Sequence, residues 1–174
     1  MKIISVIAEY NPLHNGHAYQ LQAARARLGG DCAVLVVMSG CFTQRGEPAL
    51  TDKWSRTRMA LTAGADLVLE LPFAYACGSA ERFAAGGVRT VQATGLSSHL
   101  VFGSEQGELE PLQRLAEQLV PETPAYQQSL RRQLDTGVAF PVARRQALLE
   151  QNNPEALVSL LDLPNNILAV EYLK

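Results

Sequence analysis

Short apolar runs alternate, over the first hundred positions, with segments in which apolar residues recur every three or four places. The runs are KIISVIA, CAVLVVM, DLVLEL and HLVFG, and they show almost no polar alternation. This pattern is typical of strands covered on both faces of a parallel sheet. Repeated strand-helix-strand units predict right-handed crossovers and a doubly wound, Rossmann-like α/β fold, in which ligands bind beyond the carboxyl ends of the strands.

Three helices are predicted between these strands. The first ends at Gly29-Gly30, a natural helix stop. The second lies in TDKWSRTRMALTAG, begins with a cap at Thr51 or Asp52, and is expected to turn Met59 and Leu61 inward. The third lies in SAERFAAGGVRTVQATG, where each internal glycine costs about 1 kcal/mol relative to alanine.

From Glu108 onward the strand signals vanish. Proline or glycine separates five segments with helical patterns: ELEPLQRLAEQLV, AYQQSLRRQLD, FPVARRQALLEQ, PEALVSLLD and NNILAVEYLK. We therefore expect an α/β core over residues 1–107 and a helical C-terminal portion over residues 108–174, packed on that core.

Composition limits the classes of partner. At 174 residues and 47% hydrophobic, the chain can form one main domain with a substantial core. The formal net charge of −2 lacks the strong positive balance of many nucleic-acid-binding domains, so any RNA must bind locally. No apolar run has the length of a membrane span, and Glu9 interrupts the first run too early for a secretory signal. We expect a soluble, cytoplasmic protein with no membrane partner.

Cysteine and isolated histidine give no sign of a metal centre. Cys32, Cys41 and Cys77 are widely spaced and form no C-x-x-C pair, so neither a disulfide framework nor a cysteine zinc site is predicted. His99 has no partner at ligand spacing and is interpreted as structural.

The stretch EYNPLHNGH, from Glu9 to His17, joins the first strand to the first helix. Gly16 lets an anion approach the backbone, and the start of the following helix offers unpaired N–H groups and a partial positive charge. His14 and His17 can point toward one ligand and donate hydrogen bonds to phosphoryl oxygens, which would stabilise charge that develops as an α-phosphate is attacked. The alternative is a plain turn whose histidines cap the helix or fill surface space.

The string HNGH resembles the H-x-G-H signature of the nucleotidylyltransferase superfamily, whose HUP-type α/β fold is shared with class I aminoacyl-tRNA synthetases. Six longer strings occur in the order typical of one family in it, the tRNA(Met) cytidine acetate ligases. They are IAEYNPLHNGHAYQ, VMSGCFTQRGEPAL, DKWSRTRMAL, GADLVLELPFAYACGSAERFA, LVFGSE and LPNNILAVEYLK. The resemblance covers essentially the whole chain.

The resemblance implies that acetate and ATP give acetyl-adenylate and pyrophosphate, and that the acetyl group then passes to the wobble cytidine of elongator tRNA(Met). It places His14 and His17 at the ATP phosphates as the catalytic pair and adds nucleotide contacts from Gly103 and from Asn165 or Asn166. A requirement for Mg²⁺ stays open. The segment that would line the ATP site comprises Ile7, Ala8, Glu9, Tyr10, Asn11, Pro12, Leu13, His14, Asn15, Gly16, His17, Ala18, Tyr19 and Gln20.

The stretch SGCFTQRGEPALTDKWSRTR is longer than a strand-to-helix connection needs and is rich in charge. Arg45 and Lys53 are candidates to meet the acetate, the pyrophosphate or the tRNA backbone. The alternative is a solvated charged loop with a salt-bridged helix start. Cys41 stands where the family usually has Asn, and Leu13 where it usually has Phe.

Members of that family continue beyond Lys174 and carry an S-x-x-x-I-R signature that this chain lacks. We therefore expect a shortened form, and the question whether it is active without the rest of the protein stays open. Two alternatives remain: a small-molecule adenylyltransferase of the same superfamily, and a non-catalytic nucleotide- or RNA-binding module. Arg131-Arg132 and Arg144-Arg145 could touch RNA phosphates, but paired arginines usually form a solvated face, and no tRNA-contacting residues are assigned. The oligomeric state is not predicted.

Overall fold

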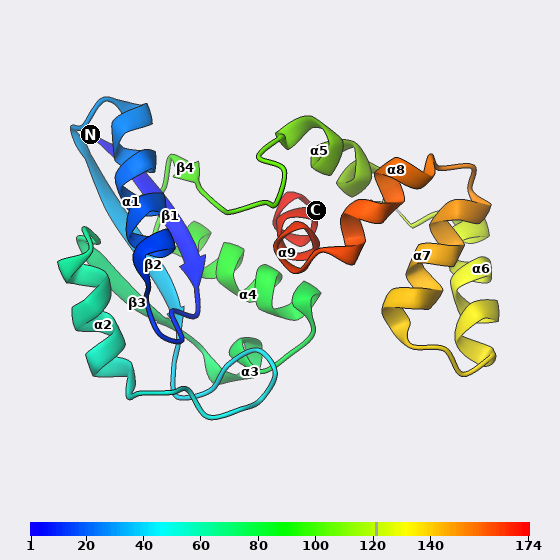
Figure 1. The fold of residues 1–174 in the computed structure, drawn as a ribbon, viewed down its shortest axis with the longest axis horizontal. Helices are drawn as coiled ribbons and strands as arrows, with labels where there is room; N and C mark the ends of the chain where they lie inside the picture. The colour runs from blue at the N-terminus through cyan, green and yellow to red at the C-terminus, as the bar shows by residue number, and fades with distance from the viewer. Residues whose placement is uncertain (121) are drawn as a thin grey trace. The chain divides into compact units, whose positions relative to one another are not determined.

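The computed structural model describes residues 1–120 and 122–174. These residues form two compact units, Met1–Phe102 and Gly103–Lys174, each of which is described by itself (Figure 1). The division predicted at residues 107 and 108 stays a prediction.

The first unit is built on a parallel sheet. Among the described residues the sheet has four strands in the order β3-β2-β1-β4, namely β1 (Lys2–Ala8), β2 (Cys32–Ser39), β3 (Leu67–Leu71) and β4 (His99–Leu100). The β1–β2 register runs from Lys2 opposite Cys32 to Ala8 opposite Met38. All three strand pairs are parallel, so the carboxyl ends of the strands meet at one edge, and the predicted doubly wound α/β fold is confirmed.

Helices cover both faces of this sheet. They are α1 (Asn15–Leu28), α2 (Lys53–Thr62), the short α3 (Phe73–Ala76) and α4 (Ala80–Ala93). Val6 and Val36 form a buried cluster with Leu21 of α1 and Ala60 of α2 on one face. On the other face, α4 comes so close to β1 that a Cβ on Gly87 would lie 2.8 Å from the side chain of Ile7.

The predicted helix boundaries have clear local causes. Asp52 is the N-cap of α2, and its carboxylate accepts the Ser55 N–H at 2.9 Å. Gly29 ends α1 in the left-handed conformation with φ 94°, a region that glycine enters without steric cost. Both expectations are confirmed.

The prediction that Met59 and Leu61 turn inward is wrong. Their exposed fractions are 40% and 44%, whereas the buried side chains of α2 are those of Arg56 and Ala60. Residues four apart lie on one stripe of a helix, and the stripe that faces the sheet is set by a charged side chain whose partners are backbone carbonyls. A pattern of apolar residues does not reveal such a stripe.

The edge strands are also less complete than predicted. Leu67 of β3 is exposed, and the run HLVFG contributes only His99 and Leu100 to β4. In the described sheet β3 pairs with β2 and β4 pairs with β1, so β3 and β4 are the edge strands. The predicted burial on both faces holds best for the two central strands, β1 and β2.

Both glycines of α4 are buried at close contacts. A Cβ on Gly86 would lie 2.3 Å from the Cβ and Cγ atoms of Tyr75, which follows β3 in the unpredicted helix α3. The low helix propensity of glycine is therefore outweighed by the close approach of two helices that it permits.

The second unit is helical. The predicted helices are confirmed as α5 (Leu109–Gln118), α6 (Pro124–Asp135), α7 (Phe140–Glu150) and α9 (Pro164–Leu173), while PEALVSLLD forms α8 (Glu155–Val158) and a 3₁₀ turn (Ser159–Asp162). Arg144 of α7 and Glu171 of α9 form a buried ion pair at 2.8 Å. None of the described helices is by itself long and apolar enough to cross a membrane.

We predict that Gly86→Ala destabilises the protein. Overpacking against Tyr75 costs typically about 1–3 kcal/mol, which exceeds or cancels the gain of about 1 kcal/mol from helix propensity. Urea denaturation measures the free energy of unfolding. Gln92→Ala, at an exposed position of the same helix, is the control and should change this free energy by less than about 0.5 kcal/mol. A Gly86→Ala variant more stable than that control would contradict the packing interpretation.

Candidate functional site

The two histidines of HNGH build the start of α1. His14 is the N-cap residue, and its Nδ1 accepts the Gly16 N–H at 3.1 Å. In return, the Nδ1 atom of His17 accepts the His14 N–H at 3.2 Å. This is a reciprocal capping box made by two imidazoles rather than by Ser and Glu.

The capping bonds fix which nitrogen of each neutral ring carries the proton. A neutral imidazole that accepts at Nδ1 carries its proton on Nε2, so His14 and His17 each present an Nε2–H donor. The rings stack with centroids 3.7 Å apart and planes 25° apart, so the two donors belong to one rigid unit. The capping role that was the alternative interpretation is real, and it leaves both donors free of the capping bonds.

Gly16 suits the same arrangement. A Cβ at this position would lie 3.0 Å from Cε1 and 3.1 Å from Nδ1 of His14, so a larger residue would make the capping ring shift by a few tenths of an ångström. The first turn of α1 contains no acidic residue. The partial positive charge of this helix end is thus open to an external anion.

Tyr10 supports the histidine pair from inside the unit. Its ring lies 4.9 Å from the His17 ring, and its backbone has φ 49°, in the left-handed region. Burial raises the pKa of Tyr10 to about 12, so its hydroxyl is neutral. Burial, and then the neighbouring His14, lower the pKa of His17, which favours its neutral form.

The remaining residues of the predicted ATP segment divide by exposure. The side chains of Ile7 and Tyr10 are packed inside the unit, and those of Ala8, Glu9, Leu13, Ala18 and Gln20 are half-buried. The exposed members are Asn11, Pro12, His14, Asn15, Gly16 and Tyr19.

Arg56 is a site residue that the sequence interpretation did not single out. Its fully buried guanidinium donates to the carbonyl of Glu9 at 2.6 Å, to that of Gly40, and through Nε to that of Thr51 at 3.3 Å. Burial lowers the pKa of Arg56, but an arginine stays protonated at neutral pH. One cation therefore joins the turns that follow β1 and β2. No pattern in the sequence distinguishes Arg56 from the neighbouring exposed cations.

Two further hydrogen bonds join the loop after β2 (residues 40–52, the charged loop) to the stretch EYNPLHNGH (residues 9–17, the histidine turn). The Glu9 carboxylate accepts the Gln44 N–H, and Asn11 Oδ1 accepts the Leu50 N–H at 2.6 Å. Both acceptors lie in the stretch EYNPLHNGH, so this stretch also shapes the loop.

The two cations predicted for the loop have different surroundings. Arg45 is exposed in a tight turn closed by the Thr43 N–H on the Glu47 carbonyl at 2.9 Å. Lys53 forms an ion pair with Glu70 at 2.6 Å, and this hydrogen bond raises the pKa of Lys53. Gly40 permits that pair, because a Cβ there would lie 2.2 Å from Oε1 of Glu70.

The other predicted nucleotide contacts lie in the second unit. Glu105 accepts the backbone N–H groups of Asn165 and Asn166, both at 3.0 Å, at the start of α9. The Asn166 side chain is buried and accepts the Glu105 N–H at 3.2 Å, whereas the Asn165 side chain is exposed. Apart from Gly103 and its two chain neighbours, no described residue comes within 4 Å of where a Cβ of Gly103 would be.

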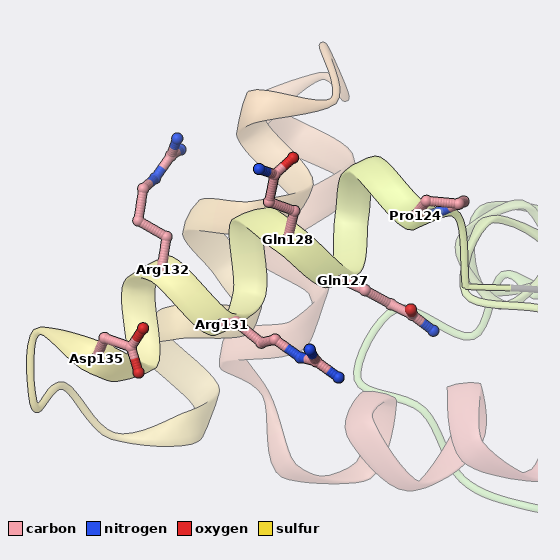
Figure 2. Close-up of a pocket in the computed structure, with 6 residues that line it drawn as sticks. All are labelled: Pro124, Gln127, Gln128, Arg131, Arg132 and Asp135. Atoms are coloured by element: carbon pink, nitrogen blue, oxygen red, sulfur yellow. The ribbon is translucent and has the colours of Figure 1, made fainter.

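The arginine pairs of the second unit are used mostly inside it. Arg144 pairs with Glu171, Arg145 with Glu155, and Arg132 with Glu150. Figure 2 shows Arg131 and Arg132 extending in different directions from α6, beside a hollow. The residues that line this hollow all belong to α6: Pro124, Gln127, Gln128, Arg131, Arg132 and Asp135.

Within residues 1–120 and 122–174 no three His, Cys, Asp or Glu side chains gather as a metal ion would require. The three cysteines are free, with Cys32 buried and Cys41 exposed. His99 contacts Ser98 Oγ at 2.9 Å.

The chain is similar along its whole length to known proteins. A family model described as HIGH Nucleotidyl Transferase matches residues 1–174. The tRNA(Met) cytidine acetate ligase of Syntrophomonas wolfei is 51% identical over 176 residues, and the match covers 100% of this chain and 42% of that protein. The protein of the same name from Acetivibrio thermocellus is 46% identical, with the same two coverages.

A solved structure agrees with these matches. The crystal structure of Thermotoga maritima TmcAL bound with α-thio ATP superposes with a TM-score of 0.93 at 45% identity, covering 99% of this chain and 42% of that one. The chain thus spans less than half the length of the curated relatives it matches. The resemblance identified in the sequence is confirmed along its whole length.

We predict that His17 makes stability depend on pH. Its pKa is lowered in the folded state, so the unfolded chain binds the proton more tightly. The contribution of neutral His17 to the free energy of unfolding is complete above its ordinary pKa near 6.5. It is lost as pH falls through the lower pKa that His17 has in the folded protein. Urea denaturation between about pH 8 and about pH 5 should show this loss in the wild type and a smaller one in His17→Gln, which cannot titrate. Equal slopes for both proteins would contradict the lowered pKa.

Proposed function

This chain belongs to the HIGH nucleotidyl transferase family, and from that membership we propose that it binds ATP at the β1–α1 turn as part of an acetate ligase. The full reaction would form acetyl-adenylate and then acetylate the wobble cytidine of elongator tRNA(Met). The activity assigned to the named relatives supports this proposal, and so does the nucleotide bound in the Thermotoga maritima structure.

Two balanced steps make up this reaction. An acetate oxygen attacks the α-phosphorus of ATP, and the bond from that phosphorus to the oxygen bridging to the β-phosphorus breaks, releasing pyrophosphate. The exocyclic amine of cytidine then attacks the acetyl carbon, AMP leaves, and the amine loses a proton. Acetate is ionised at neutral pH, so the first step needs no general base.

The observation that carries the proposal is the capping box at the start of α1, which occupies Nδ1 of His14 and His17 and leaves the Nε2–H of each neutral ring free of the capping bonds. These donors are held by the capping box before any ligand arrives, and preorganised donors stabilise charge that develops on phosphoryl oxygens. The lowered pKa of His17 favours the neutral ring, which still donates from Nε2.

Other residues have supporting roles in this proposal. Arg45 and Lys53 would meet acetate, pyrophosphate or RNA phosphates, and the Lys53 cation is maintained by Glu70. Gly103 would admit the nucleotide, with a further contact from Asn165 or Asn166, of which Asn165 offers the exposed side chain. No step is assigned to a metal ion.

We predict that replacing both imidazoles weakens ATP binding without unfolding α1. The double variant His14→Ser with His17→Ala keeps a serine oxygen as the N-cap acceptor but removes both imidazole Nε2–H donors. A lost hydrogen bond to a charged group costs about 1.5–3 kcal/mol, so the ATP dissociation constant should rise about tenfold or more per donor. Calorimetric titration measures it, with His99→Ala as the control that keeps wild-type affinity. Unchanged affinity for ATP in the double variant would contradict the proposal that His14 and His17 bind the ATP phosphates.

The reaction class is tested by exchange of labelled pyrophosphate into ATP. We expect exchange that depends on acetate when this chain is assayed within a protein of full family length. Stimulation by a mononucleotide or phosphopantetheine instead would identify a small-molecule adenylyltransferase. ATP binding without any exchange would identify a nucleotide-binding module.

A further inference from the structure

Three exposed aromatic side chains lie at the same edge of the sheet as the histidine pair. They are Phe42 in the loop after β2, Trp54 in the first turn of α2 and Phe73 at the start of α3 after β3, with exposed fractions of 37%, 66% and 64%. The sheet is parallel, so these segments gather beyond the carboxyl ends of β1, β2 and β3 (Figure 1). We call Phe42, Trp54 and Phe73 the aromatic surface.

The aromatic surface is held in place although it is exposed. The rings of Phe42 and Phe73 meet edge to face with centroids 5.5 Å apart, and Phe42 forms a β-bridge with Pro48. Lys53 Nζ lies 5.4 Å from the centroid of the Trp54 ring while it pairs with Glu70. None of the three rings belongs to the buried cluster that α1 and α2 form with the sheet, and all three remain exposed to solvent.

Cations lie beside the rings of the aromatic surface. Residues 41–58 contain four cations and two carboxylates, but Arg56 is buried against backbone carbonyls and Lys53 is paired with Glu70, which leaves Arg45 and Arg58 as exposed cations. One of the two carboxylates, that of Asp52, is occupied by the Ser55 backbone and hydroxyl. The exposed Arg45 lies in the same loop as Phe42.

Exposed rings interleaved with cations match the chemistry of single-stranded RNA. Unstacked bases stack on aromatic faces, and the cations meet the phosphates between them. A base whose exocyclic amine is to be acylated must also leave its own stack to reach a reactive centre. A protein interface would favour an apolar surface whose central part is depleted of charge.

We propose that the aromatic surface binds unstacked bases of an RNA loop beside the nucleotide site. This inference rests on the proposed function, because the RNA is the one whose cytidine would be acetylated. Lys53 and Arg45 then lie among the phosphates of the loop, and the surface brings the acceptor strand to the edge of the sheet that carries His14 and His17.

The only tryptophan of the chain is Trp54, so intrinsic tryptophan fluorescence reports directly on this surface. The probe is an RNA hairpin that carries the anticodon loop of elongator tRNA(Met), compared with a fully paired RNA duplex of the same length. We expect saturable quenching by the hairpin and little by the duplex. Stacking is worth about 1–3 kcal/mol per base, so Phe73→Ala should weaken hairpin binding about five- to a hundredfold.

Leu96→Ala is the matched control, because Leu96 is also an exposed apolar residue, at 53%, but precedes β4, away from the carboxyl ends of β1, β2 and β3. It should keep wild-type hairpin affinity, and circular dichroism should show both variants folded. Absence of quenching, equal quenching by the duplex, or unchanged affinity of Phe73→Ala overturns the proposal. The Trp54 emission could instead shift with protein concentration alone, and Phe73→Ala could abolish that shift. This result would identify the aromatic surface as a protein interface and would also overturn the RNA-binding proposal.

Failure of this inference is distinguishable from failure of the proposed function. ATP binding and pyrophosphate exchange are measured without RNA and depend on His14 and His17. Loss of those activities with hairpin quenching retained would refute the ligase proposal alone. Their presence without quenching would refute only the RNA-binding role of the aromatic surface.

Discussion

The buried guanidinium of Arg56 is the interaction on which the geometry of the first unit depends. A cation without solvent is costly unless its donors are satisfied, and here the acceptors are backbone carbonyls of Glu9, Gly40 and Thr51. These carbonyls belong to the turn after β1 and to both ends of the loop after β2. The cation therefore joins these two connections from inside, beside the bonds from the loop to Glu9 and Asn11, and it orients α2 with its inward stripe at Arg56 and Ala60.

Because of this constraint, the histidine turn and the charged loop are held together beyond the carboxyl ends of β1 and β2. Glu9 and Asn11 accept hydrogen bonds from the loop, and His14 and His17 begin α1 a few residues later. The capping box uses Nδ1 of each histidine for structure and leaves Nε2 for a ligand, so one pair of residues meets both demands. Tyr10 holds the pair against the core in a backbone conformation that few residues adopt.

The second unit uses its charges differently. Arg144 and Glu171 join α7 to α9 inside the unit, and Glu105 caps the start of α9 through the backbone of Asn165 and Asn166. Paired arginines that are conspicuous in the sequence thus serve mainly as internal ion pairs. The cations most relevant to an acidic partner are instead Arg45, exposed in the loop after β2, and Lys53, which starts α2 beside the Trp54 ring.

The sequence by itself determined the parallel α/β fold, the helix stop at Gly29, the cap at Asp52 and the position of HNGH at the first strand-to-helix turn, because these depend on local periodicity and capping chemistry. Only the tertiary structure decided that Met59 and Leu61 face outward, that Arg56 faces inward, and that Gly86 and Gly87 admit close neighbours. It also grouped Phe42, Trp54 and Phe73 at one edge. These outcomes depend on partners from distant strands and loops, which no local pattern encodes.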